Sequence, residues 1–151
     1  MSPAGEEDMA LIGTHDTPMF AGWLTGVDIG ERVRCGLLEK SSVARVRKER
    51  ALAIGRLADR LGESVEKPRA LLTALLEWLG GSDSPLVVPW LEDLWFEDEG
   101  VNVPGTRSSE RPNWQRPMRK LLDEALADPE VEALVQRLAR ARSPEHTSAT
   151  D

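Results

Sequence analysis

The stretch Leu11-Ile12-Gly13-Thr14-His15-Asp16-Thr17-Pro18 decides how the N-terminal half of this chain folds. Its apolar start predicts a strand over 9–14, and its end predicts a helix over 18–25 with Thr17 as the cap and Pro18 in the first turn. In α/β enzymes, catalytic groups follow the ends of strands. Asp16 and His15 are therefore candidate site residues. The simpler alternative is a capping turn with a histidine in the loop.

Composition limits the classes of function. The 151 residues suffice for one domain, and 40% hydrophobic with 30% charged residues is ordinary for a globular protein. The net charge of −7 argues against general binding of nucleic acid or membrane surfaces. Cys35 is the only cysteine, which excludes an internal disulfide and fits a cytoplasmic location. The acidic N-terminus lacks the apolar core of a signal peptide, and no apolar run is long enough to cross a membrane.

A second strand is predicted in the middle of the chain, because the run from Ser84 to Leu91 is almost continuously apolar. Such a run is typical of a strand buried on both faces. Helical patterns separate it from the first strand, so the two strands are expected to be parallel neighbours. The expected helices cover 29–39 (capped by Asp28), 43–61, 67–79, 117–127 and 129–142, the last capped by Asp128.

Two strands can neither bury both of their own faces nor close a barrel. The chain is thus a mostly helical domain with a minimal sheet, or part of a larger α/β architecture. Between the second strand and the last helices lies a long irregular segment. Its acidic part, with Glu92, Asp93, Glu97, Asp98 and Glu99, is expected to be a solvated loop. Long loops in compact domains are often functional.

Several kinds of chemistry have no support in the residue pattern. His15 and His146 are far apart in sequence and Cys35 has no spaced partner, so no metal site is predicted. No Ser-His-Asp or Cys-His set and no glycine-rich phosphate loop is recognisable. The basic residues of 43–61 are interpreted as a solvated face. No cofactor is expected.

Three motifs resemble 4-α-glucanotransferases, the amylomaltases or disproportionating enzymes of glycoside hydrolase family 77. The first is Gly13-Thr14-His15-Asp16-Thr17 followed by Ala21-Gly22-Trp23. The second is Glu92-Asp93-Leu94, which resembles the stretch after the last barrel strand of the family. The third is Val101-Asn102-Val103-Pro104-Gly105-Thr106 with Arg111-Pro112-Asn113-Trp114-Gln115-Arg116, similar to the family's Asn-x-Pro-Gly-Thr loop and Asn-Trp-x-Arg segment. The motifs follow the family's order over about 9–142.

The resemblance implies a (β/α)₈ TIM barrel and transfer of α-1,4-glucan segments to glucose or maltooligosaccharides by a retaining mechanism. This chain matches only the C-terminal part of that barrel, with its last two strands. Asp16 then corresponds to the carboxylate that stabilises the transition state, and His15 to the histidine that hydrogen-bonds the same sugar. The nucleophile and acid/base belong to earlier strands, so the chain alone is expected to be inactive.

The remaining site predictions concern substrate binding. By their place in the motif, Asn102, Pro104 and Gly105 are expected to shape the pocket rim, and Trp114 is a candidate to stack on a sugar ring, with Trp95 as an equal alternative. Trp23, Trp78 and Trp90 are expected in the core.

The expected organisation is a flexible lead-in over 1–8, a barrel segment over 9–142 and a polar tail over 143–151. The expected partners are α-1,4-glucan and, for the open barrel, its missing N-terminal part. The alternative function is a non-catalytic helical module that binds glucan or protein. An upstream sequence carrying the other strands and two acidic residues would favour the enzyme.

Overall fold

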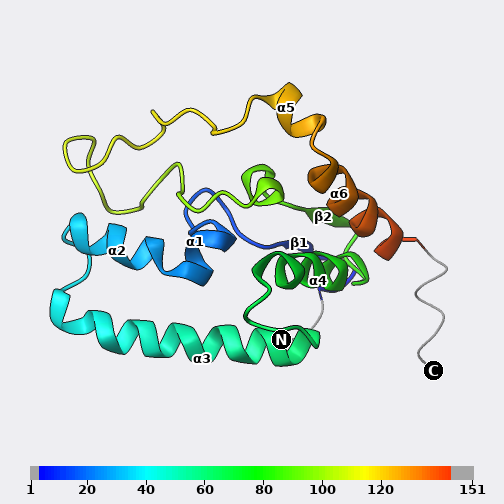
Figure 1. Ribbon diagram of the computed structural model, residues 1–151, viewed down its shortest axis with the longest axis horizontal. Coiled ribbons are helices and arrows are strands. Elements are labelled where there is room, and N and C mark those ends of the chain that lie inside the picture. Colours follow the sequence, from blue (N-terminus) through cyan, green and yellow to red (C-terminus); the bar gives the residue numbers. More distant parts are fainter. Residues whose placement is uncertain (1–3, 144–151) are drawn as a thin grey trace.

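The computed structural model describes residues 4–143 (Figure 1). Most of the predicted tail over 143–151, including His146, lies outside the described residues. The elements follow in the order β1 (Met9–Leu11), α1 (Phe20–Thr25), α2 (Val27–Arg34), the 3-10 helix η1 (Lys40–Ser42), α3 (Val43–Leu61), α4 (Pro68–Gly80), β2 (Leu86–Val88), the 3-10 helix η2 (Leu91–Trp95), α5 (Leu122–Leu126) and α6 (Pro129–Ala141). A long segment between η2 and α5 runs over α2 without regular structure (Figure 1).

The three longest helices agree with the sequence prediction, because each carries its own start or stop signal. Helix α3 spans the predicted residues and ends at Gly62, whose φ of 68° suits a residue without a Cβ. Helix α4 begins at Pro68. Helix α6 begins after Asp128, whose side chain accepts a hydrogen bond from the amide of Glu130 at 2.8 Å, so the predicted cap is confirmed.

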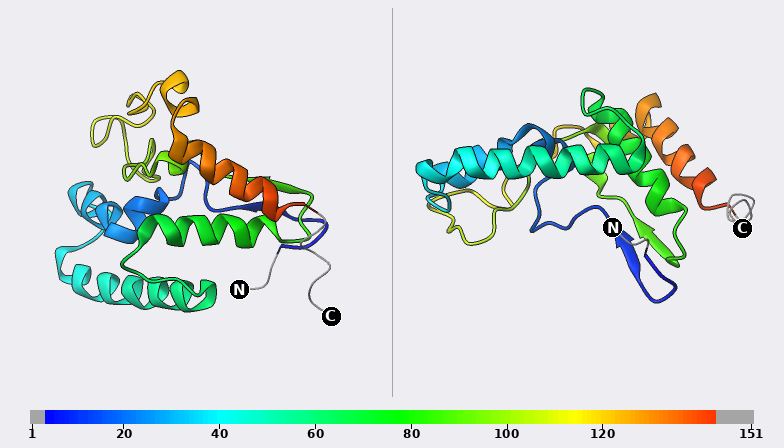
Figure 2. Two further views of the ribbon diagram at one scale, coloured as in Figure 1. Left: turned by 45° about the vertical axis from the view of Figure 1, so that its right-hand side comes forward. Right: turned by 90° about the horizontal axis from the view of Figure 1, so that it is seen from below.

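The two strands are parallel neighbours, as predicted, with Met9 opposite Leu86 and Leu11 opposite Val88. Both strands are shorter than expected. The prediction that the second strand is buried on both faces is wrong, since Leu86 is 53% exposed. Ala10 and Val87 face the core, and the right view of Figure 2 shows the helices on that side of the strands. The opposite face of the sheet is open to solvent.

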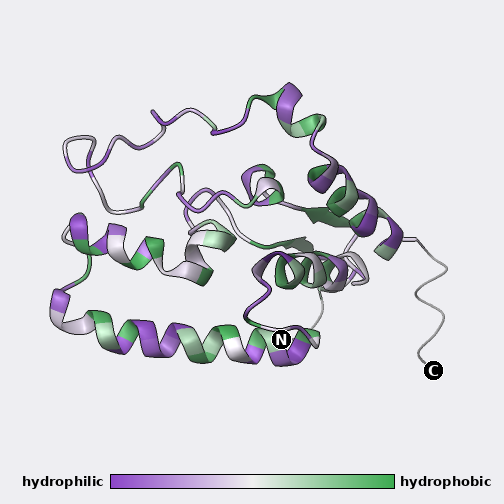
Figure 3. Cartoon of the chain, viewed as in Figure 1, coloured by the Kyte–Doolittle hydropathy of each residue, from purple (hydrophilic) through white to green (hydrophobic). Residues whose placement is uncertain are grey.

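The core is built around α4, which packs against α6 on one side and against α3 and α1 on the other. Figure 3 shows apolar residues concentrated on α4 and the strands, whereas the segment between η2 and α5 is largely hydrophilic. The buried apolar residues include Leu71, Leu72, Leu75, Leu76, Leu79, Leu94, Trp95 and Leu134. The strands and η2 are anchored to this core, so the loops that follow them start from fixed positions.

Three predicted helices have different bounds. The helix predicted over 18–25 begins only at Phe20. The predicted helix over 29–39 starts two residues early and ends at Arg34, because the amides of Leu37 and Leu38 turn back to the carbonyl of Arg32. Asp28 lies inside its first turn and pairs with Arg50 instead of capping it. The predicted helix over 117–127 keeps only α5. Within residues 4–143, no helix is long and apolar enough to span a bilayer.

Candidate functional site

A tight turn after β1 presents the His-Asp pair. The amide of Thr17 donates to the carbonyl of Thr14 at 3.0 Å, and the Thr17 hydroxyl donates to the same carbonyl at 2.8 Å. The Thr14 amide donates in turn to that hydroxyl. Thr17 therefore closes the turn. The prediction that Thr17 caps α1 is wrong, since the helix begins at Phe20. His15 and Asp16 lie at the tip of the turn, both exposed to solvent.

Helix α1 is capped from another part of the chain. The Asp93 carboxylate in η2 accepts a hydrogen bond from the Phe20 amide at 2.8 Å. Asp93 is only 3% exposed, so the expectation of a solvated acidic residue is wrong here. Burial raises the pKa of Asp93 to about 6, although the Phe20 amide opposes the shift. This contact joins the helix that follows Asp16 to the loop that follows β2.

The expectation of a solvated loop also fails for Glu97, which is 3% exposed. Its Oε1 lies 2.7 Å from a guanidinium nitrogen of Arg116 and 2.8 Å from one of Arg119. Arg119 also pairs with Asp98, and Arg116 with Glu99. A buried carboxylate requires such partners.

The site forms where residues distant in sequence converge. The side-chain amide of Asn102 donates a hydrogen bond to Oδ1 of Asp16 at 2.8 Å. The Nε2 atom of His15 lies 3.4 Å from the other carboxylate oxygen of Asp16, Oδ2. The indole of Trp114 lies against His15, with ring centroids 5.3 Å apart at 53°. A carboxylate, an imidazole and an exposed aromatic face together suit recognition of a ring that carries hydroxyl groups.

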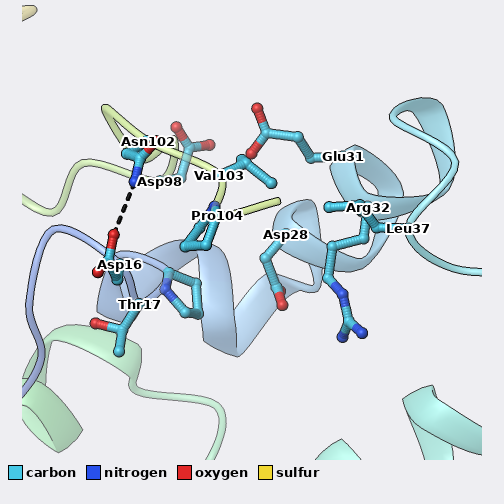
Figure 4. A pocket seen from close by; sticks show the side chains of 12 residues that line it. Asp16, Thr17, Asp28, Glu31, Arg32, Leu37, Asp98, Asn102, Val103 and Pro104 are labelled. Carbon is cyan, nitrogen blue, oxygen red and sulfur yellow. Dashed lines mark hydrogen bonds between the residues drawn. The ribbon is translucent and has the colours of Figure 1, made fainter. Parts of the chain in front are cut away.

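A cavity of about 240 Å³ adjoins Asp16 (Figure 4). Its walls come from the turn after β1, from α2 and from the 98–104 loop, and include Pro18, Asp28, Glu31, Arg32, Asn102 and Pro104. Asp28 and Glu31 are paired with Arg50 and Arg111, respectively. Gly105 forms the turn beyond Pro104 with a φ of 84°, in the left-handed region that favours glycine. Asn102 and Pro104 thus lie at the wall of the cavity beside Asp16.

Trp95 and Trp114, predicted as equal candidates for sugar stacking, differ in exposure. Trp95 is 7% exposed and belongs to the core, which leaves Trp114, 61% exposed, as the aromatic residue of the site. Trp23 and Trp78 are half-buried and pack against the core, as predicted, whereas Trp90 is half-buried outside it. Trp114 has a φ of 62°, which is strained for a bulky residue, and its amide bonds to the carbonyl of Val101 at 2.9 Å.

Sequence reasoning missed two residues that shape the site. Arg111 and Asn113 lie inside the quoted Arg-Pro-Asn-Trp motif, yet only Trp114 was assigned a role. Their side chains connect the two ends of the loop, and their fixed spacing from Trp114 was the available signal. In the described part of the chain, no three His, Cys, Asp or Glu side chains group closely enough to hold a metal ion.

Comparison with known proteins adds the family context. The model of glycoside hydrolase family 77, described as 4-alpha-glucanotransferase, matches residues 2–123. The 4-alpha-glucanotransferases of Mycobacterium bovis and Mycobacterium tuberculosis are 33% identical over 119 residues, covering 73% of this chain and 16% of theirs. Amylomaltase from Corynebacterium glutamicum has a similar structure, with a TM-score of 0.67 and 26% identity over 91% of this chain and 22% of its own. The chain thus spans about a sixth of the curated relatives it matches.

Proposed function

This chain belongs to the 4-alpha-glucanotransferases of glycoside hydrolase family 77, and on that premise we propose that it supplies the Asp16 wall of an α-1,4-glucan transfer site. The observation that carries the proposal is the hydrogen bond from Asn102 to Asp16, with Trp114 packed on the neighbouring His15. Two motifs that lie far apart in the sequence meet at one carboxylate. A helix-capping turn alone needs no such convergence.

The proposed chemistry is retaining transfer of a glucan segment to glucose or a maltooligosaccharide. As the glycosidic bond breaks, the sugar becomes oxocarbenium-like, and hydrogen bonds to its 2-hydroxyl strengthen. Asp16 accepts such a bond, and a charge-assisted bond is stronger than a neutral one. Asn102 fixes one carboxylate oxygen, His15 donates to a sugar hydroxyl, and Trp114 covers a ring face. Retaining transfer also needs a nucleophile and an acid/base about 5–5.5 Å apart. We assign these to strands outside this chain.

For the architecture, we propose that β1 and β2 are the last two strands of a (β/α)₈ barrel and that 9–142 is one barrel segment. The open face of the sheet supports this assignment. Met9, Leu86 and Val88 are 56%, 53% and 40% exposed, respectively, whereas parallel strands are normally covered on both faces. The proposed partner for this face is the remaining part of the barrel.

A chimera tests the activity. Residues 9–142 of this chain, the proposed barrel segment, replace the corresponding segment of the Mycobacterium tuberculosis 4-alpha-glucanotransferase, and the product is incubated with maltotriose. We expect glucose and longer maltooligosaccharides to form. The same relative without the segment is the control. A folded chimera with no transfer would refute the assignment of the site.

The isolated chain provides the complementary test. We expect the purified 151-residue protein to produce no glucose from maltotriose, because Asp16 and His15 cannot replace the two missing carboxyl groups. Disproportionation by the isolated chain would show that the catalytic pair lies within it.

A further inference from the structure

The loop from Gly100 to Trp114 is closed on itself by one arginine. The guanidinium of Arg111 donates to the carbonyls of Gly100 and Val101, the latter at 3.0 Å, and to the side-chain oxygen of Asn113 at 2.8 Å. Asn113 extends the ring, since its oxygen also accepts from the amide of Val103 at 3.1 Å. The two ends of the loop are thus held together by side chains near its base.

The same arginine ties the loop to helix α2. Its Nε donates to Oε1 of Glu31 at 2.5 Å, and the two side chains are only 10% and 13% exposed. An ion pair at this depth resists opening, because removal of one partner leaves a buried charge without compensation. Glu31 also lines the cavity beside Asp16, so the anchor lies next to the site.

The loop presents two side chains to the His-Asp pair. Asn102 follows directly after Val101, whose carbonyl Arg111 binds, and it donates to Asp16. Trp114 follows Asn113, and its strained backbone is held by the same Val101 carbonyl. Both contacts therefore depend on the position of one short piece of backbone.

We infer that Arg111 is a positioning residue: by joining Gly100, Val101 and Asn113 to Glu31, it fixes Asn102 on Asp16 and Trp114 on His15. The relevance of Arg111 to glucan transfer rests on the proposed function, whereas its effect on the positions of Asn102 and Trp114 does not. Arginine is required because Nε and both terminal nitrogens are used in one planar fork. A lysine carries the same charge and cannot reach this set of acceptors.

The test is nuclear magnetic resonance of the full chain without any glucan. The chain has only two asparagines, so the side-chain amide signals of Asn102 and Asn113 can be assigned. In the parent protein, we expect a nuclear Overhauser effect cross-peak between ring protons of His15 and Trp114. In Arg111→Lys and in Glu31→Gln, that peak is expected to disappear and the Asn102 side-chain signal to shift, while the backbone amide signals of α4 and α6 remain in place.

Arg137→Lys is the matched control, because Arg137 pairs with Glu77 between α6 and α4, away from the loop. It should leave the His15–Trp114 peak and the Asn102 signal unchanged. If both remain in Arg111→Lys, the loop holds its place without the arginine and the inference is wrong. Loss of the α4 and α6 signals in Arg111→Lys would also overturn it, since Arg111 would then support the whole fold. Neither outcome depends on glucan transfer, so this test and that of the proposed function fail separately.

Discussion

At the residue scale, Asp16 is defined by contacts from distant parts of the sequence. The side chain that holds its Oδ1 is 86 positions away. Local sequence explains why a polar turn follows β1, because Thr14 and Thr17 can close it. It does not explain why the carboxylate has a fixed amide donor. That donor depends on the loop geometry that Arg111 and Asn113 create.

Gly22 provides a residue-scale prediction about the packing of α1. A Cβ at this position would overlap the backbone carbonyl oxygen of Asp98, and backbone cannot give way as a flexible side chain can. We expect Gly22→Ala to lower the free energy of unfolding by about 1–3 kcal/mol, as overpacking does. Urea denaturation followed by circular dichroism measures this.

The control for Gly22 is Gly55 in the interior of α3. Nothing lies within 4 Å of a Cβ there, and alanine is the better helix former. Gly55→Ala is expected to leave stability unchanged or raise it by up to about 1 kcal/mol. Equal destabilisation by both substitutions would contradict the close approach of α1 to the Asp98 backbone.

At the scale of elements, the cap of α1 makes stability depend on pH. Burial raises the pKa of Asp93 to about 6, with a smaller contribution from the charge of Glu92. The folded state thus favours the protonated carboxyl, and ionisation of Asp93 opposes folding. Its unfavourable contribution is complete above pH 6 and disappears as pH falls from about 6 to 3.8. It corresponds to roughly 3 kcal/mol.

Asp93→Asn tests this contribution, because its side-chain oxygen can still accept from the Phe20 amide but does not titrate. We expect the difference between variant and parent in the free energy of unfolding to be largest at pH 7 and to shrink toward pH 4. Urea unfolding at pH 4, 5, 6 and 7 measures it. A constant difference across this range would show that Asp93 does not titrate near 6.

The elements that the sequence predicts well are those with local signals. Helix α3 ends at a glycine, and α6 starts at an Asp-Pro pair, so their bounds follow from periodicity and caps. The order and parallel pairing of the strands also follow from the pattern. The lengths of the strands do not follow from the pattern, because a short apolar run does not show which of its residues are in a strand.

The failures have a common physical cause. Asp93 and Glu97 were expected in solvent because acidic residues usually are. Their burial depends on the Phe20 amide and on Arg116, which lie elsewhere in the sequence. The same holds for the site. The family resemblance places Asp16 and Asn102 in one site, whereas residue patterns alone do not predict that the two loops meet.

At the scale of the whole molecule, the sheet has one covered and one open face. This arrangement predicts that a charged side chain lowers the free energy of unfolding at one position of β2 and hardly changes it at the next. Val88 is 40% exposed, so Val88→Lys should change the free energy of unfolding by no more than about 0.5 kcal/mol. Val87 packs against the core, so Val87→Lys should be clearly destabilising. Thermal denaturation of the two variants compares the faces, and similar losses in both would mean that the face of Val88 is not open.

The central claim is that Asp16 stabilises the transition state of glucan transfer. The most direct measurement is kcat for maltotriose disproportionation by the chimera described above, with Asp16 and with Asp16→Asn. Hydrogen bonds that strengthen in the transition state are worth several kcal/mol, so we predict a fall in kcat of about 100-fold or more with an unchanged melting temperature. A kcat within a few-fold of the Asp16 chimera would contradict the account.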